Sequence, residues 1–219
     1  NSHLRLTEPN SILITGITGF VGSHMAELLI KEFPKSRIYG VKRWHLSNLK
    51  NISHILEKIT FIDCDITDPV STADLLNLSK PDVVFHFAAE SFVDRSISDP
   101  NSFLVSNIRG TFTILDVITK QKKRLVQIST DEVFGSLKSE TANEESVFNP
   151  SSPYAATKAS AELLINSYVK TYNSDVIITR CTNNYGPRQY AEKLIPKTII
   201  LAKQNKKIPI YGKGTNIRD

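Results

Sequence analysis

Short apolar runs recur along the chain, and segments with helical spacing of their apolar residues separate them. The runs lie at residues 12–14, 37–41, 59–64, 82–87 and 124–129, and the helical segments near 21–33, 69–78 and 101–119. Period and length together predict strands that alternate with helices. Such strands form a parallel sheet with right-handed crossovers, so the predicted fold class is α/β with a doubly wound sheet.

Three glycines follow the first apolar run, in the stretch SILITGITGFVGSHM at residues 11–25. Gly16, Gly19 and Gly22 stand three residues apart, directly before a helical pattern. Glycine lets the chain turn tightly and approach a pyrophosphate, and the N–H groups at a helix N-terminus favour negative charge. The stretch predicts a dinucleotide site of the Rossmann type, although a sharp structural turn would also use three glycines.

Composition and charge exclude several other classes. The 219 residues, 40% of them hydrophobic, can bury a sizeable core. The net charge of +5 comes from dispersed basic residues, so we expect no nucleic acid partner. No membrane span or signal segment is recognisable, so we expect a cytoplasmic protein. Cys64 and Cys181 read as buried thiols of a reducing compartment, and the histidines lack metal-ligand spacing, so no metal is expected.

Ligands of a doubly wound sheet bind beyond the carboxyl ends of its strands, so the residues there are candidates. Lys42 and Arg43 follow the second strand, where an NAD-binding fold usually places an acid. The two are either an ordinary solvated loop or bind the 2′-phosphate of NADP, for which Arg43 has the better geometry. Candidates after the third and fourth strands are Asp65, Ile66, Phe87, Ala88 and Ala89.

The most informative local pattern begins at the end of the fifth strand. Ser129-Thr130-Asp131-Glu132 ends that strand, and Ser152 and Pro153 then open a helix as N-cap and first residue. Tyr154 and Lys158 stand one turn apart on the same face of this helix. A nearby lysine favours the phenolate and lowers the pKa of the tyrosine, which yields a base for hydroxyl oxidation. The pair alone could also be an exposed tyrosine and lysine.

Several segments together carry a family resemblance, namely GITGFVG, FHFAAES, STDEVFG, YAATK, TNNYGP, EKLIP and YGKGTNIRD. From about residue 11 to 219 the chain resembles the extended short-chain dehydrogenase/reductase family. Within that family it is most similar to the nucleotide-sugar 4,6-dehydratases of the dTDP-glucose 4,6-dehydratase type. The glycine motif and Tyr-x-x-x-Lys are shared by the wider family, whereas Thr-Asp-Glu is more specific.

The resemblance implies a mechanism in which an NDP-hexose becomes a 4-keto-6-deoxy sugar with a recycled NAD(P) hydride. Tyr154 would remove the proton of the sugar 4-hydroxyl, Thr130 would bind that hydroxyl, and Lys158 would hold the cofactor ribose. Glu132 would then take the C5 proton, and Asp131 would protonate the departing 6-hydroxyl. Two adjacent carboxyl groups can have opposite protonation where a desolvated site pushes their pKa values apart.

The resemblance also implies two sets of binding residues. Together with the glycine turn and Arg43, the cofactor set is Gly16, Gly19, Phe20, Val21, Gly22, Arg43, Asp65, Ile66, Phe87, Ala88, Ala89, Ser91, Ser106, Tyr154, Lys158 and Asn184. The nucleotide-sugar set is Ser91, Thr130, Asn183, Lys193, Leu194, Pro209, Ile210, Tyr211 and Arg218. Residues 11–180 would form the NAD(P)-binding domain. Residues 181–219 would begin a smaller substrate domain that is incomplete, because such enzymes are usually longer.

Two departures from the family pattern leave the sugar nucleotide and the cofactor open. Phe92 stands where the dTDP-glucose enzymes usually have histidine, and Lys42-Arg43 replaces the expected acid. Arg43 makes the chain similar to the GDP-mannose 4,6-dehydratases and slightly favours NADP, whereas the overall resemblance favours NAD. An NDP-sugar 4-epimerase or reductase of the same scaffold and a non-catalytic cofactor-binding protein also remain open as functions.

The resemblance finally implies a homodimer. The helices that begin near residues 101 and 154 are long and apolar on more than one face, and they are adjacent in this fold. We expect them to pair with their copies in an isologous four-helix contact, as in the family.

Overall fold

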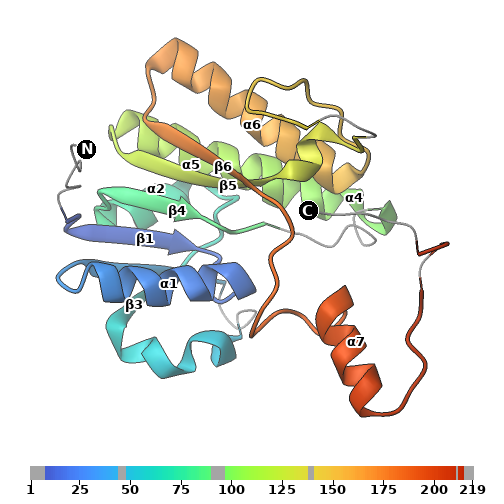
Figure 1. Cartoon of the computed structure of the whole chain (residues 1–219). Coiled ribbons are helices and arrows are strands. Elements are labelled where there is room, and N and C mark those ends of the chain that lie inside the picture. The colour runs from blue at the N-terminus through green and yellow to red at the C-terminus, as the bar shows by residue number, and fades with distance from the viewer. Residues whose placement is uncertain (1–7, 44–47, 90–96, 138–140, 211, 215–219) are drawn as a thin grey trace, which may run out of the picture. The chain divides into compact units, whose positions relative to one another are not determined.

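The computed structural model describes residues 8–43, 48–89, 97–137, 141–210 and 212–214. The chain divides into two compact units, residues 1–181 and 182–219. Within the described part of the first unit, six parallel strands form one sheet in the order β3-β2-β1-β4-β5-β6 (Figure 1). The strands are β1 (Ser11–Thr15), β2 (Arg37–Lys42), β3 (Ile59–Asp63), β4 (Val83–His86), β5 (Arg124–Thr130) and β6 (Val176–Cys181). The predicted α/β class with a doubly wound parallel sheet is confirmed.

The strand order reverses between β1 and β4. The chain first adds β2 and β3 on one side of β1, and then crosses to pair β4 with the other side, with Thr15 opposite His86. In a doubly wound sheet this switch point is where a ligand binds, outside the carboxyl ends of the strands. The glycine turn follows β1 at this point.

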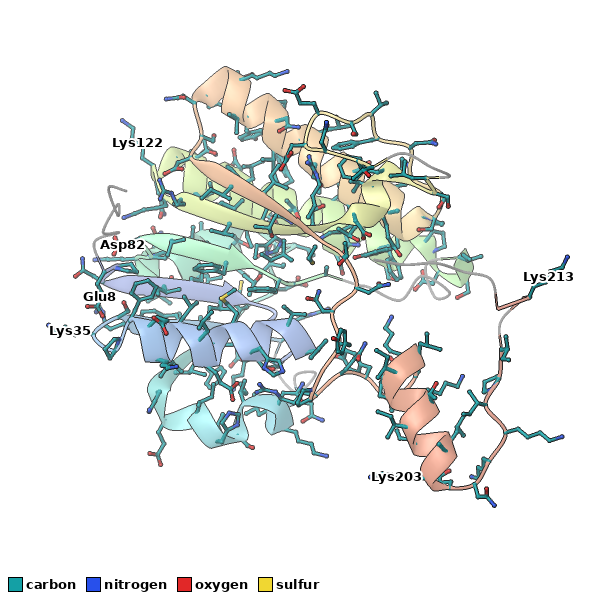
Figure 2. The ribbon with its side chains drawn as sticks, viewed as in Figure 1. Glu8, Lys35, Asp82, Lys122, Lys203 and Lys213 are labelled. Atoms are coloured by element: carbon teal, nitrogen blue, oxygen red, sulfur yellow. The ribbon has the colours of Figure 1, made fainter. Side chains whose placement is uncertain are left out.

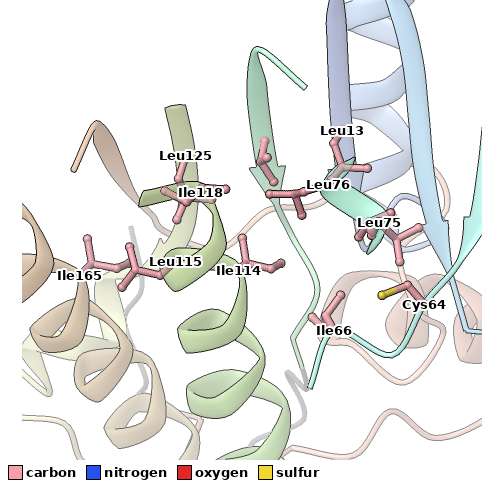
Figure 3. Packing of buried hydrophobic residues seen from close by; sticks show 12 residues of the cluster. Leu13, Cys64, Ile66, Leu75, Leu76, Ile114, Leu115, Ile118, Leu125 and Ile165 are labelled. Carbon is pink, nitrogen blue, oxygen red and sulfur yellow. The ribbon is translucent and has the colours of Figure 1, made fainter. Parts of the chain in front are cut away.

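Alternation along the strands divides the core into two layers. Ile12 and Ile14 of β1 pack with the layer under α1 (Phe20–Glu32) and the 3₁₀-helical segment η2 (Leu49–Lys58). Leu13, between them, packs into the opposite layer. That layer is covered by α2 (Pro69–Ser79), α5 (Gly110–Lys120) and α6 (Pro153–Tyr172), as Figure 3 shows for part of the cluster. A strand with both faces buried explains the uninterrupted apolar run.

The amino edge of the sheet is closed by Asp82, which precedes β4. Its carboxylate accepts hydrogen bonds from the backbone N–H groups of Asn10 and Ser11, at 2.7 and 3.3 Å. Glu8 and Lys35 lie at the same end of the molecule, and Figure 2 labels them together with Asp82. These contacts give the amino edge of the sheet a structural role. The candidate residues predicted from the sequence lie at the opposite, carboxyl edge.

The helix predicted over residues 101–119 is continuous but changes its hydrogen-bonding pattern along its length. It consists of α4 (Pro100–Phe103), the π-helical segment η3 (Leu104–Arg109) and α5. The helix predicted near these residues is therefore present, with one π-helical segment that contains Asn107, a buried residue whose amide donates to the Thr157 hydroxyl at 3.0 Å. Tertiary contacts of this kind override local helical spacing.

The start of α6 agrees with its sequence pattern. Ser152 is the N-cap, its hydroxyl accepts from the Ala155 N–H at 3.1 Å, and Pro153 is the first helical residue. Asn173 ends the helix in the left-handed region with φ 54°. In the second unit the main element is α7 (Leu194–Lys203). None of the helices in the described ranges has the length and apolar character needed to cross a bilayer.

Candidate active site

The glycine turn after β1 leaves no room for side chains. Gly16 has φ +67°, and a Cβ there would lie 2.7 Å from the backbone nitrogen of Ala88. A Cβ on Gly22 would lie 2.2 Å from the Gly16 carbonyl oxygen, and one on Gly19 would lie 3.2 Å from the same atom. Gly19 is also the N-cap of α1 and offers no capping side chain. Such a cradle, closed by the turn after β4, fits a dinucleotide pyrophosphate.

The end of β3 presents an ordered carboxylate. Burial raises the pKa of Asp65, but hydrogen bonds from the Thr67 N–H and hydroxyl, together with the Arg43 charge, lower it below its usual value. The Ile66 carbonyl accepts hydrogen bonds from the hydroxyls of Thr72 and Thr113 at 3.2 and 2.5 Å, which ties this strand end to α2 and α5. Asp65 and Ile66 are therefore held at the carboxyl edge of the sheet. The sequence analysis predicted that they bind the cofactor there, near its adenine.

Tyr154 and Thr130 meet where β5 ends and α6 begins. Burial of the Tyr154 phenol, followed by the Glu132 carboxylate, raises its pKa above the ordinary value. Cys181 and Asp131 act in the same direction, and a hydrogen bond with Thr130 opposes them. The structure thus brings one phenol, one hydroxyl and two carboxyl groups to a single place.

Two backbone features hold the Thr-Asp-Glu turn. Asp131 and Glu132 begin the short 3₁₀ segment η4 (Asp131–Phe134), and Thr130 is its N-cap. The Thr130 hydroxyl accepts from the Glu132 N–H and donates to the Asp131 carboxylate, both at 3.2 Å. Gly135 follows with φ +72°, and a Cβ there would lie 2.0 Å from the Asn149 carbonyl oxygen.

Lys158 lies one turn after Tyr154 and is only 6% exposed. Burial lowers the pKa of its ammonium group to about 8, and Cys181 and Glu162 partly oppose this shift. Its Nζ donates to the Ile128 carbonyl at 2.6 Å. The sequence predicted that Lys158 lowers the pKa of Tyr154, whereas the largest influences on the phenol in this structure are burial and Glu132, and both raise its pKa.

A buried histidine, His86, lies within hydrogen-bond distance of residues on β1 and α5 next to the switch point of the sheet. His86 Nδ1 lies 2.6 Å from the Thr15 hydroxyl, and Nε2 lies 3.2 Å from the Thr111 hydroxyl. The Ala88 N–H donates to Thr15 at 3.1 Å. Burial, reinforced by the Lys158 charge, lowers the pKa of His86 to about 3. Neutral His86 therefore connects Thr15, the residue before the glycine turn, to Thr111 of α5.

Sequence reasoning missed two buried polar residues near the site, Asn107 and Glu162. Asn107 holds Thr157, which lies between Tyr154 and Lys158 on α6. Glu162 is fully buried on α6 and forms an ion pair with Arg180 of β6. In the sequence each is a single polar residue within a helical pattern of apolar residues, which gives no sign of a role. The role becomes visible only through the partner residues, 18 to 50 positions away along the chain.

The remaining predicted residues fall into three groups. Phe20, Val21, Phe87, Ala88 and Ala89 adjoin the glycine turn or follow β4, and Ser106 lies in η3. Ser91, Tyr211 and Arg218, as well as Phe92, lie outside the described residues. The others belong to the second unit, with Lys193 as the N-cap of α7: Asn183, Asn184, Lys193, Leu194, Pro209 and Ile210. Among the residues that the structure describes, no cluster of His, Cys, Asp or Glu is suited to a metal ion.

Fold and site together define a dinucleotide-binding α/β protein of the short-chain dehydrogenase/reductase type, with Thr-Asp-Glu beside Tyr-x-x-x-Lys. The family model described as GDP-mannose 4,6 dehydratase matches residues 13–219. The chain belongs to this family, which confirms the resemblance to nucleotide-sugar dehydratases.

Individual relatives agree with this membership. The chain is 38% identical over 212 residues to a dTDP-glucose 4,6-dehydratase of Mycolicibacterium smegmatis, covering 95% of this chain and 63% of the relative. A solved dTDP-glucose 4,6-dehydratase of Streptomyces venezuelae with NAD bound has a TM-score of 0.87 at 39% identity, over 94% of this chain and 66% of that one. The chain spans just under two thirds of these relatives.

The fold is also shared by enzymes of different chemistry. A UDP-glucose 4-epimerase of Thermotoga maritima has a TM-score of 0.87 at 26% identity, over 95% of this chain and 68% of that one. Because both chemistries occur on the same architecture, the fold does not choose between them. The choice depends on the residues of the site.

Proposed function

We propose that the protein is an NAD(P)-dependent nucleotide-sugar 4,6-dehydratase that converts an NDP-hexose, such as dTDP-glucose, to its 4-keto-6-deoxy product. One observation carries the proposal: the Tyr154 phenol shares a hydrogen bond with Thr130 while the carboxylates of Glu132 and Asp131 act on the same phenol. Oxidation at C4 and elimination across C5 and C6 both find their acid and base groups there. Family membership and the names of the relatives support the same activity.

In the oxidation step Tyr154 takes the proton of the 4-hydroxyl, and Thr130 orients that hydroxyl. The glycine turn and the ends of β3 and β4 would hold NAD(P), which would supply the hydride chemistry between C4 and C6. Lys158 has N–H donors beyond the one that binds Ile128, and these suit the ribose. Its positive charge favours the phenolate form of Tyr154.

In the elimination step Glu132 removes the C5 proton, which the neighbouring 4-keto group has made acidic. Asp131 donates a proton to the departing 6-hydroxyl, so a carbon–carbon double bond forms and one water leaves. After the hydride has returned to C6, Glu132 gives the proton back to C5. This division of labour requires one ionised and one protonated carboxyl group in the same small site.

A modest preference for NADP is part of the proposal. Arg43 follows β2, where an acid would repel a 2′-phosphate. Its charge acts partly on Asp65, and Lys42 is engaged by Asp63 with 3.8 Å between Nζ and Oδ1. We therefore expect less than the roughly tenfold to hundredfold preference that a charged hydrogen bond of ~1.5–3 kcal/mol provides. The solved relative with NAD bound is a reason to expect the opposite choice.

Cofactor choice is tested by titrating the apo protein with NAD and NADP, in the wild type and in Arg43→Asp. A lower ratio of NADP to NAD affinity in the variant supports the role of Arg43. Tighter binding of NAD by the wild type, with an unchanged ratio in Arg43→Asp, would make Arg43 a surface residue.

The second unit is proposed as the beginning of the nucleotide-sugar domain. Lys193 and Arg218 have the charge that a diphosphate requires, and Asn183, Pro209, Ile210 and Tyr211 complete the expected contacts. A cytoplasmic location belongs to the same proposal, because neither Cys64 nor Cys181 is in a disulfide, as is usual in reducing compartments.

A homodimer through α5 and α6 is proposed as well. An apolar groove of about 400 Å³ is lined by Leu104, Val105, Ile108, Arg109, Phe112 and Leu164. Leu163 and Tyr172 on α6 are 60% and 61% exposed. Exposed apolar faces on two adjacent helices are what an isologous four-helix contact would cover.

The function is tested with the full-length protein and four substrates: dTDP-glucose, UDP-glucose, CDP-glucose and GDP-mannose. A 4-keto-6-deoxy product from one of them supports the dehydratase, and the preferred substrate names the base. Glu132→Gln should still oxidise C4, seen as transient reduced cofactor, yet fail to exchange solvent deuterium into C5. A product that keeps its 6-hydroxyl would indicate an epimerase or reductase, and cofactor binding without turnover a non-catalytic protein.

A further inference from the structure

The mechanism proposed above leaves one fully buried ionic group unused. Glu162 is 0% exposed on α6, one turn beyond Lys158. Its carboxylate accepts hydrogen bonds from Arg180 of β6, with Nη2 at 2.7 Å from Oε2 and Nε at 3.0 Å from the same oxygen. It also accepts a hydrogen bond from the Ser129 hydroxyl. One carboxylate therefore joins α6 to β5 and β6.

Arg180 makes a second kind of contact on its other side. Its guanidinium carbon lies 5.2 Å from the centre of the Phe134 ring and 5.4 Å from that of Phe148. Guanidinium groups at this distance from an aromatic face are attracted to it. The Nη1 group also donates to the Glu144 carbonyl at 3.5 Å, so Arg180 holds the segment that covers η4.

These contacts bracket the Thr-Asp-Glu turn. Ser129, bound by Glu162, immediately precedes Thr130, and Phe134, contacted by Arg180, ends η4. The ion pair thus touches both ends of the segment that carries Thr130, Asp131 and Glu132. It is anchored on the helix that presents Tyr154 and Lys158.

We propose that the Glu162–Arg180 ion pair is a positioning device that sets the distance between the carboxyl groups on η4 and the Tyr154–Lys158 face of α6. This inference rests on the proposed dehydratase function. Tyr154 and Lys158 are placed by α6 itself and by the Ile128 carbonyl, so oxidation at C4 depends on the pair only through Thr130. Elimination needs the carboxyl groups of Asp131 and Glu132 at the correct distance from the oxidised sugar. The contacts of the ion pair at both ends of residues 129–134, called the bracket below, fix that distance.

Stability alone is a weak explanation of a buried ion pair. Removing two charges from water offsets much of their attraction, and replacing both by neutral residues of similar size is often tolerated. Removing one partner leaves an uncompensated charge and costs far more. A double replacement therefore separates positioning from folding, whereas a single replacement does not.

The test uses Glu162→Gln combined with Arg180→Met, because Gln can still accept from Ser129 and neither side chain is charged. With the preferred nucleotide sugar, single-turnover formation of reduced cofactor reports oxidation, and deuterium exchange at C5 reports elimination. We expect oxidation within about threefold of the wild-type rate. Elimination should slow by about tenfold to a hundredfold, the usual result of misplacing a reacting group by roughly 1 Å.

A conservative variant adds a second readout. Arg180→Lys keeps the charge but loses the planar, bidentate geometry and the stacking on Phe134. It should slow elimination relative to oxidation in the same sense as the double variant. Equal rates per folded protein, or an equal loss in both steps, in both variants would overturn the proposal and leave the pair a purely stabilising one.

The exposed ion pair of Arg124 and Asp175 is the control, with 2.9 Å from Nε to Oδ2. It joins the first residue of β5 to the residue before β6, at the opposite end of these strands from Ser129 and Arg180. Arg124→Met should leave both steps unchanged. If the wild type converts none of the four sugars, the dehydratase proposal fails, and hydrogen exchange of residues 129–135 still tests the bracket. Faster exchange there in the double variant than in Arg124→Met supports it, and equal exchange overturns it.

Discussion

At the scale of single residues, burial decides the acid–base properties of the site. Tyr154, Lys158 and His86 all have pKa values shifted toward their neutral forms, and burial is the first cause in each case. A tyrosine held neutral near a carboxylate is a poor base until a positive charge approaches it. Oxidation should therefore depend on the charges that surround Tyr154 as much as on the residue itself.

Replacing Tyr154 with Phe should abolish turnover while the fold is retained. The phenyl ring preserves the edge contact with Phe103, whose centroid is 6.4 Å away, but the base is gone. We expect a loss of about a hundredfold or more in kcat, measured as product formation, with the melting temperature nearly unchanged. Tyr168→Phe, farther along α6, is the control. Activity near wild type in Tyr154→Phe would remove this residue from the mechanism.

His86 should make stability depend on acidity. Its pKa is about 3 in the folded protein against 6.5 for the ordinary side chain, so the unfolded chain binds more protons between these values. The contribution of neutral His86 to the free energy of unfolding is therefore complete above pH 6.5, and it is lost progressively as the pH falls toward 3. Over the whole interval between the two pKa values the contribution is on the order of 5 kcal/mol, at 1.36 kcal/mol per pKa unit.

The measurement is the free energy of unfolding between pH 7 and 4. His86→Asn should have a shallower pH dependence than the wild type, because the titrating group is absent. His54→Gln, at a 50% exposed side chain, is the control variant. Parallel curves for His86→Asn and the wild type would show that another group causes the acid sensitivity.

At the scale of elements, the termini of strands and helices carry the chemistry. The turn between β1 and α1, the ends of β3 and β4, and η4 all lie at the carboxyl edge of the sheet. The glycine turn has little steric freedom, because Gly16 and Gly22 face backbone atoms rather than flexible side chains. A methyl group cannot be accommodated there without a backbone shift.

Gly22→Ala should weaken cofactor binding by about tenfold or more and destabilise the fold by about 1–3 kcal/mol. Its Cβ would meet the Gly16 carbonyl oxygen at 2.2 Å. Cofactor titration and thermal unfolding measure the two effects. Gly110→Ala in α5 is the control, because its Cβ would meet side-chain atoms of Ile66 and Thr67 rather than backbone, the nearest at 3.1 Å. Unchanged affinity in Gly22→Ala would show that the turn does not cradle the cofactor.

At the scale of the whole molecule, the apolar groove on η3, α5 and α6 is the feature to explain. Phe112 lines it and is 39% exposed. A charge introduced there appears twice in an isologous interface, so Phe112→Glu should convert a dimer to a monomer. Light scattering of the full-length protein at micromolar concentration measures this. Val70→Glu, at a 70% exposed position on α2, is the control. A wild-type protein that is already monomeric would refute the dimer.

Much of the fold and of the site could be predicted from the sequence, because both depend on local rules. Alternating strand and helix patterns specify a parallel sheet, and its strand ends must meet at one edge. The Ser152-Pro153 helix start and the glycine turn follow from backbone requirements of single residues. These features need no knowledge of which distant side chains meet.

Only the tertiary structure decided how burial and long-range pairing act on those residues. The pKa of Tyr154 is raised rather than lowered because the phenol is buried beside Glu132, a fact about three-dimensional surroundings. The π turn at Asn107 and the ion pair of Glu162 with Arg180 each join residues 18 to 50 positions apart, and no local pattern encodes such contacts. Sequence by itself determined which groups stand at the strand ends, whereas packing determined their charges and their distances.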